Sequence, residues 1–287
     1  MHITINGARL FFDVRGEKLI PDGPTMRERS TLLLLHGGPG GDHAMFRPAF
    51  DGLADIAQVI YLDHRGNGRS DHCTPDEWTL AQWGDDVKTF CDTLGIAKPI
   101  VLGYSFGGMV LQAYATRHPG HAGKLIFYST SPKVDREENY AVFERLGGAV
   151  ARAVAEARWK TPNPETQRAY IETCYPLYNR RATRDPNAAL RSIENDAVAF
   201  HFGGPDGPDG QAVRLDYREA LANIECPSLV VAGEDDPITP VSRSRLLAAS
   251  LPPHLVRLEV VPNAGHGVHN DDPQGTMALL RDFILHG

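Results

Sequence analysis

Residues 99–117 read PIVLGYSFGGMVLQAYATR, and this stretch decides the fold class. An apolar, strand-like run at 100–102 leads into GYSFG at 103–107, which matches G-x-S-x-G, and a helix-like run follows from Met109. A serine between two glycines on a sharp strand-to-helix turn is the arrangement called a nucleophile elbow. The glycines allow the tight turn, because side chains there would collide with the neighbouring strand and helix. The stretch therefore predicts an α/β protein with Ser105 as nucleophile, and a glycine-rich turn without chemistry is the alternative.

Strand-like and helix-like segments alternate on both sides of this stretch. Short, mostly apolar runs are typical of strands that are buried on both faces, and they occur at 31–35, 59–62, 99–102, 125–128, 228–232 and 256–261. Apolar residues at helical spacing occur between them, at 80–94, 240–249 and 276–285. The chain opens with a hairpin-like pair at 3–5 and 10–14. This alternation predicts a mostly parallel central sheet flanked by helices.

The alternation stops between residues 132 and 213, where no buried strand run occurs. Apolar residues at helical spacing mark three helices there, around 142–154, 170–175 and 190–200, and the stretch closes with GGPDGPDG at 203–210. The sequence therefore predicts a core formed by residues 1–131 and 214–287, with a helical cap at 132–213. We expect the cap to set substrate choice through an apolar pocket over Ser105.

Charge and cysteine content restrict the partners and the compartment. The 287 residues include 29 Lys and Arg against 36 Asp and Glu, a formal net charge of −7, which argues against nucleic acid or an anionic membrane as the main partner. The four cysteines lie far apart without a CxxC pair, so free thiols are expected rather than disulfides or a zinc site. No apolar run approaches the roughly 20 residues of a membrane span, and the N-terminus lacks a signal-peptide pattern. We expect a cytoplasmic protein that acts on a small-molecule substrate.

A second glycine-rich turn, HGGPGG at 36–41, follows the first buried strand. Acyl transfer requires backbone N–H groups aimed at the developing oxyanion. We expect one donor from Phe106, which follows the nucleophile, and the other from Gly38, where the missing side chain lets a carbonyl approach closely. A phosphate-binding loop is the alternative, but no Lys-Ser/Thr follows and the G-x-G-x-x-G spacing is missing. His36 is expected to hydrogen-bond the loop backbone rather than to act in catalysis.

The acid and the base of a triad should follow the nucleophile in the order Asp or Glu, then His. GEDDP follows one late strand and NAGHGVH follows the last one. Asp236 is favoured over Asp235 as the acid, and His266, which lies between two glycines, is favoured over His269 as the base. The two histidines lack an HExxH context or a carboxylate set suited to zinc, so neither a metal nor a cofactor is expected.

The loop DHRGNGRS at 63–70 follows another strand of the predicted sheet. Its glycines and charges indicate a structured scaffold at the same edge of the sheet as the nucleophile. Within it, His64 is a candidate for lining the substrate pocket, and Tyr104, the neighbour of Ser105, is another.

Taken together, HGGPGG, DHRGNGRS, GYSFGG, GEDDPITP and NAGHGVHNDDP resemble the motifs of the α/β-hydrolase superfamily, and more narrowly those of the proline iminopeptidase group. The resemblance spans about residues 32–283 and includes the cap. It implies an α/β-hydrolase fold with Ser105 as nucleophile, Asp236 as acid by its spacing from Gly233, and His266 as base. It also implies that Gly38 and Phe106 supply the oxyanion N–H groups.

One of the two amine-binding glutamates in the aminopeptidase pattern that the resemblance implies is missing here. Family aminopeptidases commonly carry a glutamate directly after the catalytic aspartate to hold the substrate's free amine, and here that residue is Pro237. A second amine-binding glutamate usually comes from the cap, where Glu194 stands. We therefore expect a serine hydrolase of a small ester, lactone or amide. The alternatives are an N-terminal prolyl aminopeptidase, a perhydrolase or C–C hydrolase with the same triad, and a ligand receptor that keeps the hydrolase shell.

Overall fold

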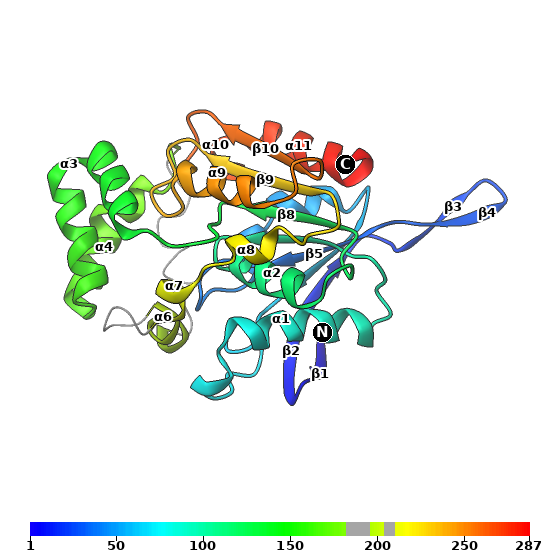
Figure 1. Cartoon of the computed structure of the whole chain (residues 1–287). Coiled ribbons are helices and arrows are strands. Elements are labelled where there is room, and N and C mark those ends of the chain that lie inside the picture. Colours follow the sequence, from blue (N-terminus) through cyan, green and yellow to red (C-terminus); the bar gives the residue numbers. More distant parts are fainter. Residues whose placement is uncertain (182–195, 204–209) are drawn as a thin grey trace.

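The computed structural model describes residues 1–181, 196–203 and 210–287, and a sheet of eight strands runs through its centre (Figure 1). The strand order is β1-β2-β6-β5-β7-β8-β9-β10. The first two pairs are antiparallel and every pair from β6 onward is parallel, as predicted. The strands are β1 (His2–Ile5), β2 (Ala8–Arg15), β5 (Thr31–Leu35), β6 (Gln58–Leu62), β7 (Ile100–Tyr104), β8 (Lys124–Tyr128), β9 (Ser228–Gly233) and β10 (Val256–Val261).

Both faces of the sheet are covered, which explains the apolar runs. Side chains alternate across a strand, so Leu33 and Leu35 enter one core cluster while Leu32 and Leu34 enter another. The first cluster includes buried residues of α1 (Leu80–Thr93), α2 (Phe106–Arg117) and α9 (Val241–Ser250). The second includes residues of η1 (His43–Phe46), η2 (Ala49–Leu53), α10 (Val268–Asp271) and α11 (Pro273–His286).

The carboxyl ends of four parallel strands bring the predicted motifs to one edge of the sheet. β5 ends directly before His36, β7 directly before Ser105, and the loops after β9 and β10 carry Asp236 and His266. Parallel strands expose their carboxyl ends at the same edge, which is where ligands bind in open α/β sheets. Residues distant in sequence therefore meet there.

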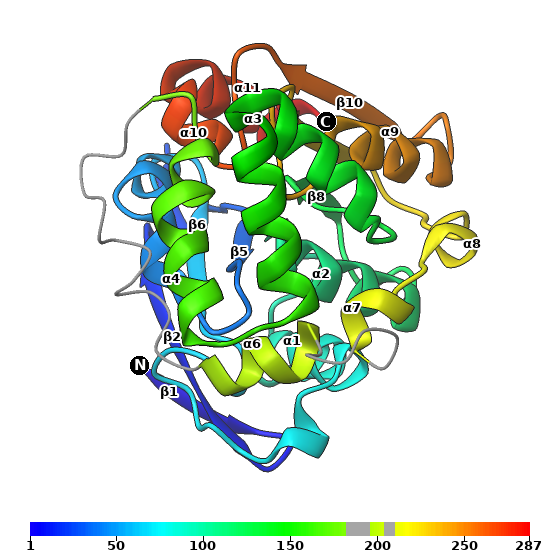
Figure 2. The same ribbon diagram turned by 90° about the vertical axis from the view of Figure 1, so that its left-hand side faces the viewer.

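Residues 132–213, here called the insertion, are helical in their described parts. They include α3 (Arg136–Lys160), α4 (Pro164–Thr173), η4 (Tyr175–Leu177), α6 (Asp196–Gly203) and α7 (Gln211–Arg214). Figure 2 shows α3 and α4 lying across the ends of the strands. The prediction of one continuous helix around 142–154 is wrong, because the chain kinks inside α3 at Gly148. The φ of Gly148 is 72°, a value that only glycine adopts easily. The third predicted helix falls partly outside the described residues, and α6 covers its end.

Three further elements complete the described fold, and the sequence pattern did not indicate the first. A two-stranded hairpin, β3 (Leu19–Asp22) with β4 (Thr25–Glu28), projects from the body (Figure 1). Its residues are almost all exposed, so no burial pattern marks it in the sequence. The other two are η3 (Pro75–Glu77) and α8 (Arg218–Leu221). No helix in the described parts of the chain combines the length and the apolar composition that a membrane crossing requires.

Candidate active site

Ser105 lies on a strained turn between β7 and α2. Its φ of 54° and ψ of −115° are unfavourable for a residue with a side chain. The turn is held by hydrogen bonds from the Ser105 N–H to the Tyr128 carbonyl at 2.9 Å and from the Thr130 hydroxyl to the Ser105 carbonyl at 2.8 Å. A Cβ on Gly107 would collide with the carbonyl of Leu35 in the adjacent strand. The packing therefore requires the glycine of the motif and turns Ser105 out of the sheet.

A continuous hydrogen-bonded chain joins Ser105, His266 and Asp236. The Ser105 Oγ lies 3.0 Å from His266 Nε2, and His266 Nδ1 lies 2.8 Å from Asp236 Oδ2. An ionised carboxylate can only accept, so Nδ1 carries the proton and Nε2 is left to accept from the serine hydroxyl. All three residues are buried, with 8%, 5% and 0% of their surface exposed respectively. The structure thus brings together the three residues predicted as nucleophile, base and acid.

The turn after β9 separates the two neighbouring aspartates. Asp236 accepts hydrogen bonds from the backbone N–H groups of Ile238 and Thr239 at 2.7 and 2.9 Å, and from the Thr239 hydroxyl at 2.7 Å. These bonds fix its carboxylate with one oxygen facing His266. Asp235 instead forms ion pairs with two insertion arginines, Arg145 and Arg180. It makes no contact with His266 in the described structure.

The second histidine of the motif occupies a different environment. His269 is buried among aromatic rings, with ring centroids of Phe50 at 5.2 Å and Tyr128 at 5.9 Å. Its backbone N–H donates to the Tyr128 hydroxyl at 2.7 Å. Burial and the nearby His266 lower the pKa of His269 to about 4, so its ring is neutral at physiological pH. Its position is that of a packing residue.

The loop that carries His266 is held by a segment of the insertion, which the sequence analysis did not identify. The His266 N–H donates to the Tyr178 carbonyl at 2.6 Å, and the Gly267 N–H donates to Asn179 Oδ1 at 3.0 Å. The edge of the Tyr178 ring also lies against the His266 ring, with centroids 5.8 Å apart. A Cβ on Gly265 would collide with the Tyr178 carbonyl, which explains the glycine before the histidine.

Asp271 completes this arrangement from the far side of the loop. One of its carboxylate oxygens accepts from the Gly265 N–H at 2.7 Å, and the other accepts from the N–H groups of Arg180 and Arg181 at 2.9 and 2.8 Å. Asp271 is buried, with 5% of its surface exposed, so its carboxylate makes these hydrogen bonds where little water can compete. We call the contacts between residues 178–181 and residues 265–271 the histidine junction. No short sequence motif marks it, because its two halves lie about 90 residues apart.

The loop HGGPGG lies directly against Ser105. A Cβ on Gly37 would lie 3.3 Å from the Ser105 Cβ and 3.1 Å from the Tyr104 ring. Gly38 has a φ of 124°, which favours glycine. Within the described residues, neither the Gly38 N–H nor the Phe106 N–H donates to a protein acceptor. Phe106 is the first residue of α2, and the helix dipole favours negative charge at this N-terminal end.

His36 and His64 are in contact, with their rings tilted by 53° and the ring centroids 4.5 Å apart. His36 Nδ1 bonds the Gly37 carbonyl at 2.7 Å, and its Nε2 accepts the His64 backbone N–H at 3.1 Å. His36 therefore bonds loop backbone, as expected. His64 is buried against the Phe106 ring at 5.6 Å, and burial holds the pKa of its imidazole well below the usual range. Tyr104 packs on the His266 ring at 5.1 Å, so both predicted pocket residues lie beside members of the site.

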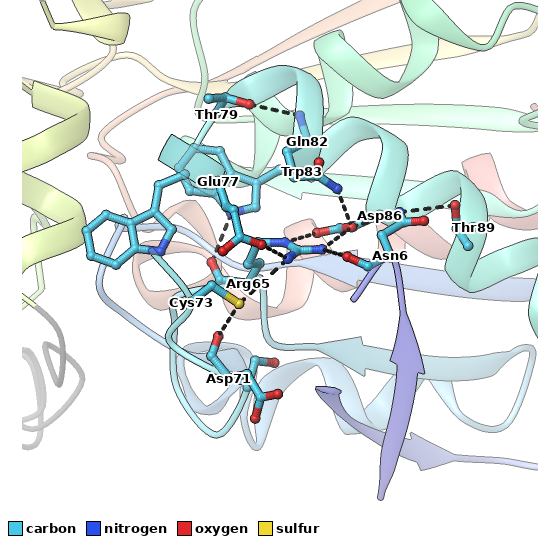
Figure 3. A network of polar contacts seen from close by, with 12 residues as sticks. Asn6, Arg65, Asp71, Cys73, Glu77, Thr79, Gln82, Trp83, Asp86 and Thr89 are labelled. Carbon is cyan, nitrogen blue, oxygen red and sulfur yellow. Dashed lines mark hydrogen bonds and ion pairs between the residues drawn. The ribbon is translucent and has the colours of Figure 1, made fainter. Parts of the chain in front are cut away.

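The loop DHRGNGRS is anchored by Arg65 (Figure 3). The fully buried guanidinium bonds both carboxylate oxygens of Asp86 at 2.9 Å, and it also bonds Glu77 at 2.7 Å. The Arg65 carbonyl accepts from the Trp83 indole at 2.9 Å, and the Trp83 ring packs edge-on against Phe106 at 4.9 Å. The loop therefore supports the residue after the nucleophile, which agrees with its interpretation as scaffold.

The resemblance also drew attention to Glu194 and Pro237. Glu194 lies outside the described residues. Pro237 follows Asp236, and its carbonyl accepts a hydrogen bond from Asn139 of α3 at 2.8 Å. Within the described residues, no group of three or more His, Cys, Asp or Glu side chains is arranged to hold a metal ion.

Comparisons with known proteins agree on the fold. Residues 30–273 match the family described as the alpha/beta hydrolase fold. A relative from Caulobacter sp. (strain K31), described as a candidate carbamate hydrolase (RutD), is 30% identical over 98% of this chain and 97% of its own. Proline iminopeptidase PfmaB of Pestalotiopsis fici is also 30% identical, over 98% of each chain. The crystal structure of VinJ superposes with a TM-score of 0.80 at 25% identity, covering 99% of this chain and 97% of VinJ.

Proposed function

The chain belongs to the α/β-hydrolase fold family and is a hydrolytic enzyme, and we propose that it is a serine hydrolase of small esters, lactones or amides. Ser105 is the nucleophile, His266 the base and Asp236 the acid of the proposed reaction. The observation that carries this proposal is the hydrogen-bonded chain of 3.0 and 2.8 Å that ends on a serine held at an elbow. A serine needs a neighbouring base for activation, and the base needs an orienting partner.

The first half of the proposed reaction forms an acyl-enzyme. The Ser105 Oγ attacks the substrate carbonyl carbon while its proton moves to His266 Nε2. The carbonyl π electrons move to oxygen, and the N–H groups of Gly38 and Phe106 stabilise the resulting oxyanion. The carbonyl re-forms as the bond to the leaving group breaks, and the leaving alcohol or amine takes the proton from His266. Asp236 stabilises the imidazolium through Nδ1 without itself taking the proton.

The second half returns the enzyme to its starting state. A water molecule gives a proton to His266 Nε2 and attacks the acyl carbon. The tetrahedral intermediate collapses, the carboxylic acid leaves, and Ser105 Oγ regains the proton from His266. The two halves together consume one water and need no redox cofactor or metal for their electron balance.

The insertion is the proposed cap over this site, and residues 1–131 and 214–287 are the proposed core. Its aromatic residues Tyr140, Phe143 and Tyr170 pack in one cluster with Trp159 and Tyr178 at its border. Because Tyr178 also contacts His266, this cluster is continuous with the site. Substitutions in it should change relative kcat/KM between substrates rather than lower all values equally.

A neutral substrate fits this site better than a free amine. An ammonium entering a capped site loses hydration and needs compensating carboxylates. Pro237 provides none, and the neighbouring Asp235 is paired with Arg145 and Arg180. We therefore expect kcat/KM for a short-chain aryl ester to exceed that for a prolyl anilide under the same conditions. Faster cleavage of the prolyl substrate would support the aminopeptidase alternative instead.

Covalent labelling tests the proposed nucleophile. A fluorophosphonate should add to Ser105 in the wild-type protein, and mass spectrometry of the digested protein should locate the adduct there. Ser105→Ala should lose the label and lower kcat on the order of 10⁴-fold or more, with an unchanged circular dichroism spectrum. Retention of a tenth of wild-type activity would refute the assignment. Specific binding of an ester without turnover would support the receptor alternative.

A further inference from the structure

The described part of the proposed cap contains an arginine to which no carboxylate is paired. Arg136 is the first residue of α3, and its side chain makes no hydrogen bond or ion pair within the described residues. Its guanidinium carbon lies 4.5 Å from the centre of the Trp159 ring. The acidic residues beside it in sequence are engaged elsewhere, since Glu137 pairs with Arg152 and Glu138 pairs with Arg243. The remaining neighbour, Asp135, caps the helix by accepting its first N–H groups.

Arg136 faces the part of the cap that contacts the triad. The Trp159 ring beneath its guanidinium packs against the rings of Tyr140 and Tyr170, with ring centroids 5.7 and 5.5 Å apart. The Tyr170 and Tyr178 hydroxyls are hydrogen-bonded at 2.8 Å, and the Tyr178 ring contacts the His266 ring. Arg136 is thus connected to His266 through successive ring contacts of Trp159, Tyr170 and Tyr178.

The same turn of α3 also contacts the acid loop. Asn139, three residues after Arg136, donates hydrogen bonds to the carbonyls of Pro237 and Ile238 at 2.8 and 2.6 Å. Pro237 is the residue directly after Asp236. The first turn of α3 is therefore fixed close to the triad from two directions, through Tyr178 and through Asn139.

Among the described residues alone, the position of the Arg136 charge is energetically unfavourable. Burial lowers the pKa of Arg136, and the nearby Arg158 acts in the same direction. A cation in the first helical turn also opposes the helix dipole. A desolvated charge is tolerated when a partner of opposite sign approaches it, and the described chain provides no such partner. Arg136 nevertheless remains partly accessible, so a ligand can reach it.

We propose that Arg136 is a substrate-binding residue and receives a carboxylate carried by the ester or amide that is cleaved at Ser105. This inference rests on the proposed hydrolase function. A guanidinium matches a carboxylate through paired N–H···O bonds, and the aromatic wall around it strengthens the attraction by excluding water. The same charge repels a substrate ammonium. The substrates it selects are half-esters or half-amides of dicarboxylic acids and related acids with a free carboxylate.

The test compares two aryl esters that differ in one end group. The aryl half-ester of adipate carries a terminal carboxylate, and the aryl ester of hexanoate ends in a methyl group on an acyl chain of equal length. We expect the ratio of kcat/KM for adipate over hexanoate to fall ~10- to 100-fold in Arg136→Gln, the loss typical of one charged hydrogen-bonding partner. Arg136→Lys should restore part of the ratio.

Arg257→Gln is the matched control for net charge. Arg257 lies on β10, where it pairs with Glu259 and Asp282 at the surface. Arg257→Gln removes one positive charge, as Arg136→Gln does, and should leave the adipate-to-hexanoate ratio of kcat/KM at the wild-type value. If Arg136→Gln does not fold, competitive inhibition of the wild-type protein by adipate and by its neutral diamide replaces the comparison, and the diamide should bind more weakly.

The possible results separate this inference from the proposed function. An unchanged adipate-to-hexanoate ratio in folded Arg136→Gln, or equal inhibition by adipate and its diamide, overturns the role of Arg136 while the hydrolase function stands. Failure of the wild-type protein to hydrolyse any ester or to react with fluorophosphonate at Ser105 overturns the proposed function first.

Discussion

The backbone N–H of His266 donates a hydrogen bond to the carbonyl oxygen of Tyr178, with 2.6 Å between nitrogen and oxygen. This bond joins the predicted base to a residue of the insertion, and Asp271 reinforces it by binding backbone N–H groups on both sides of the junction. The orientation of the His266 ring toward Ser105 therefore depends on contacts made outside the core of the sheet.

Asp271→Asn should lower both activity and stability. The amide cannot accept from the Gly265 N–H and from the Arg180 and Arg181 N–H groups at once, since only one of its terminal atoms is an acceptor. We expect a loss of about 1–3 kcal/mol in the free energy of unfolding, and a ~10- to 100-fold fall in kcat from misplacement of the base. Denaturant unfolding and steady-state kinetics measure the two effects.

The control for this substitution is Asp282→Asn, which removes an exposed carboxylate from α11. It should change neither quantity appreciably. A destabilised Asp271→Asn protein with wild-type kcat would show that the histidine junction supports the fold but does not position His266.

Glycines near Ser105 should differ sharply in their response to alanine. A Cβ on Gly107 would collide with the Leu35 backbone, so Gly107→Ala should prevent stable folding. A Cβ on Gly37 would meet the Tyr104 ring and Ser105 Cβ at 3.1 and 3.3 Å, tight contacts that a small shift relieves. Gly37→Ala should fold but lose activity, as measured by melting temperature and kcat/KM.

Gly52→Ala is the corresponding neutral substitution, because a Cβ there meets nothing within 4 Å. It should match the wild-type protein in both measurements. Full activity in Gly37→Ala would mean that the substrate does not approach Ser105 past Gly37.

Buried histidines should make the protein less stable at mildly acidic pH. The pKa of His269 is about 4 in the folded chain and about 6.5 in an unfolded one. Between these values the unfolded chain binds the proton more tightly, so the free energy of unfolding falls as pH drops from about 6.5 to 4, by up to about 3 kcal/mol. Burial also lowers the pKa values of His36 and His64, which act in the same direction.

Denaturant unfolding at several pH values tests this prediction. His269→Gln should flatten the pH dependence between pH 6.5 and 4, whereas replacement of the exposed His286 by glutamine should leave it as in the wild-type protein. Parallel curves for His269→Gln and the wild type would contradict the prediction.

The Arg65–Asp86 pair should contribute far more to stability than a surface pair of the same geometry. Arg65→Met leaves the buried Asp86 carboxylate without its cation, which typically costs about 3–5 kcal/mol. Arg117 makes two similar bonds to Asp85, but its side chain is 45% exposed, so Arg117→Met should cost about 1 kcal/mol or less. Equal losses in the two variants, measured by denaturant unfolding, would contradict the argument from burial.

The sheet and the arrangement of Ser105, His266 and Asp236 could be predicted because their signals lie in short stretches of sequence. A strand buried on both faces, such as 31–35, is almost entirely apolar, and the G-x-S-x-G motif is one continuous stretch of five residues. The order of the motifs along the chain then places Ser105, Asp236 and His266 at one edge of a parallel sheet. The distinction between Asp235 and Asp236 depended on the resemblance, because only the folded turn shows which carboxylate faces His266.

The parts that escaped prediction depend on contacts between distant segments. No sequence pattern predicts that residues 178–181 contact residues 265–271, and the exposed hairpin of β3 and β4 has no buried face to produce a pattern. Arg136 is one of 29 Lys and Arg residues in the sequence. It becomes distinctive only in the structure, where the neighbouring Glu137 and Glu138 are paired with other arginines. Such features follow from the assembled packing rather than from residue type or spacing.

The histidine junction has a consequence for protein engineering. A chimera that replaces residues 132–213 with the cap of a relative also replaces residues 178–181, and with them the support of the host's His266 loop. Such a graft therefore changes the contacts that hold the His266 loop together with the residues that we propose as the cap. Grafts in this protein therefore need to retain residues 178–181 or to exchange residues 265–271 with them.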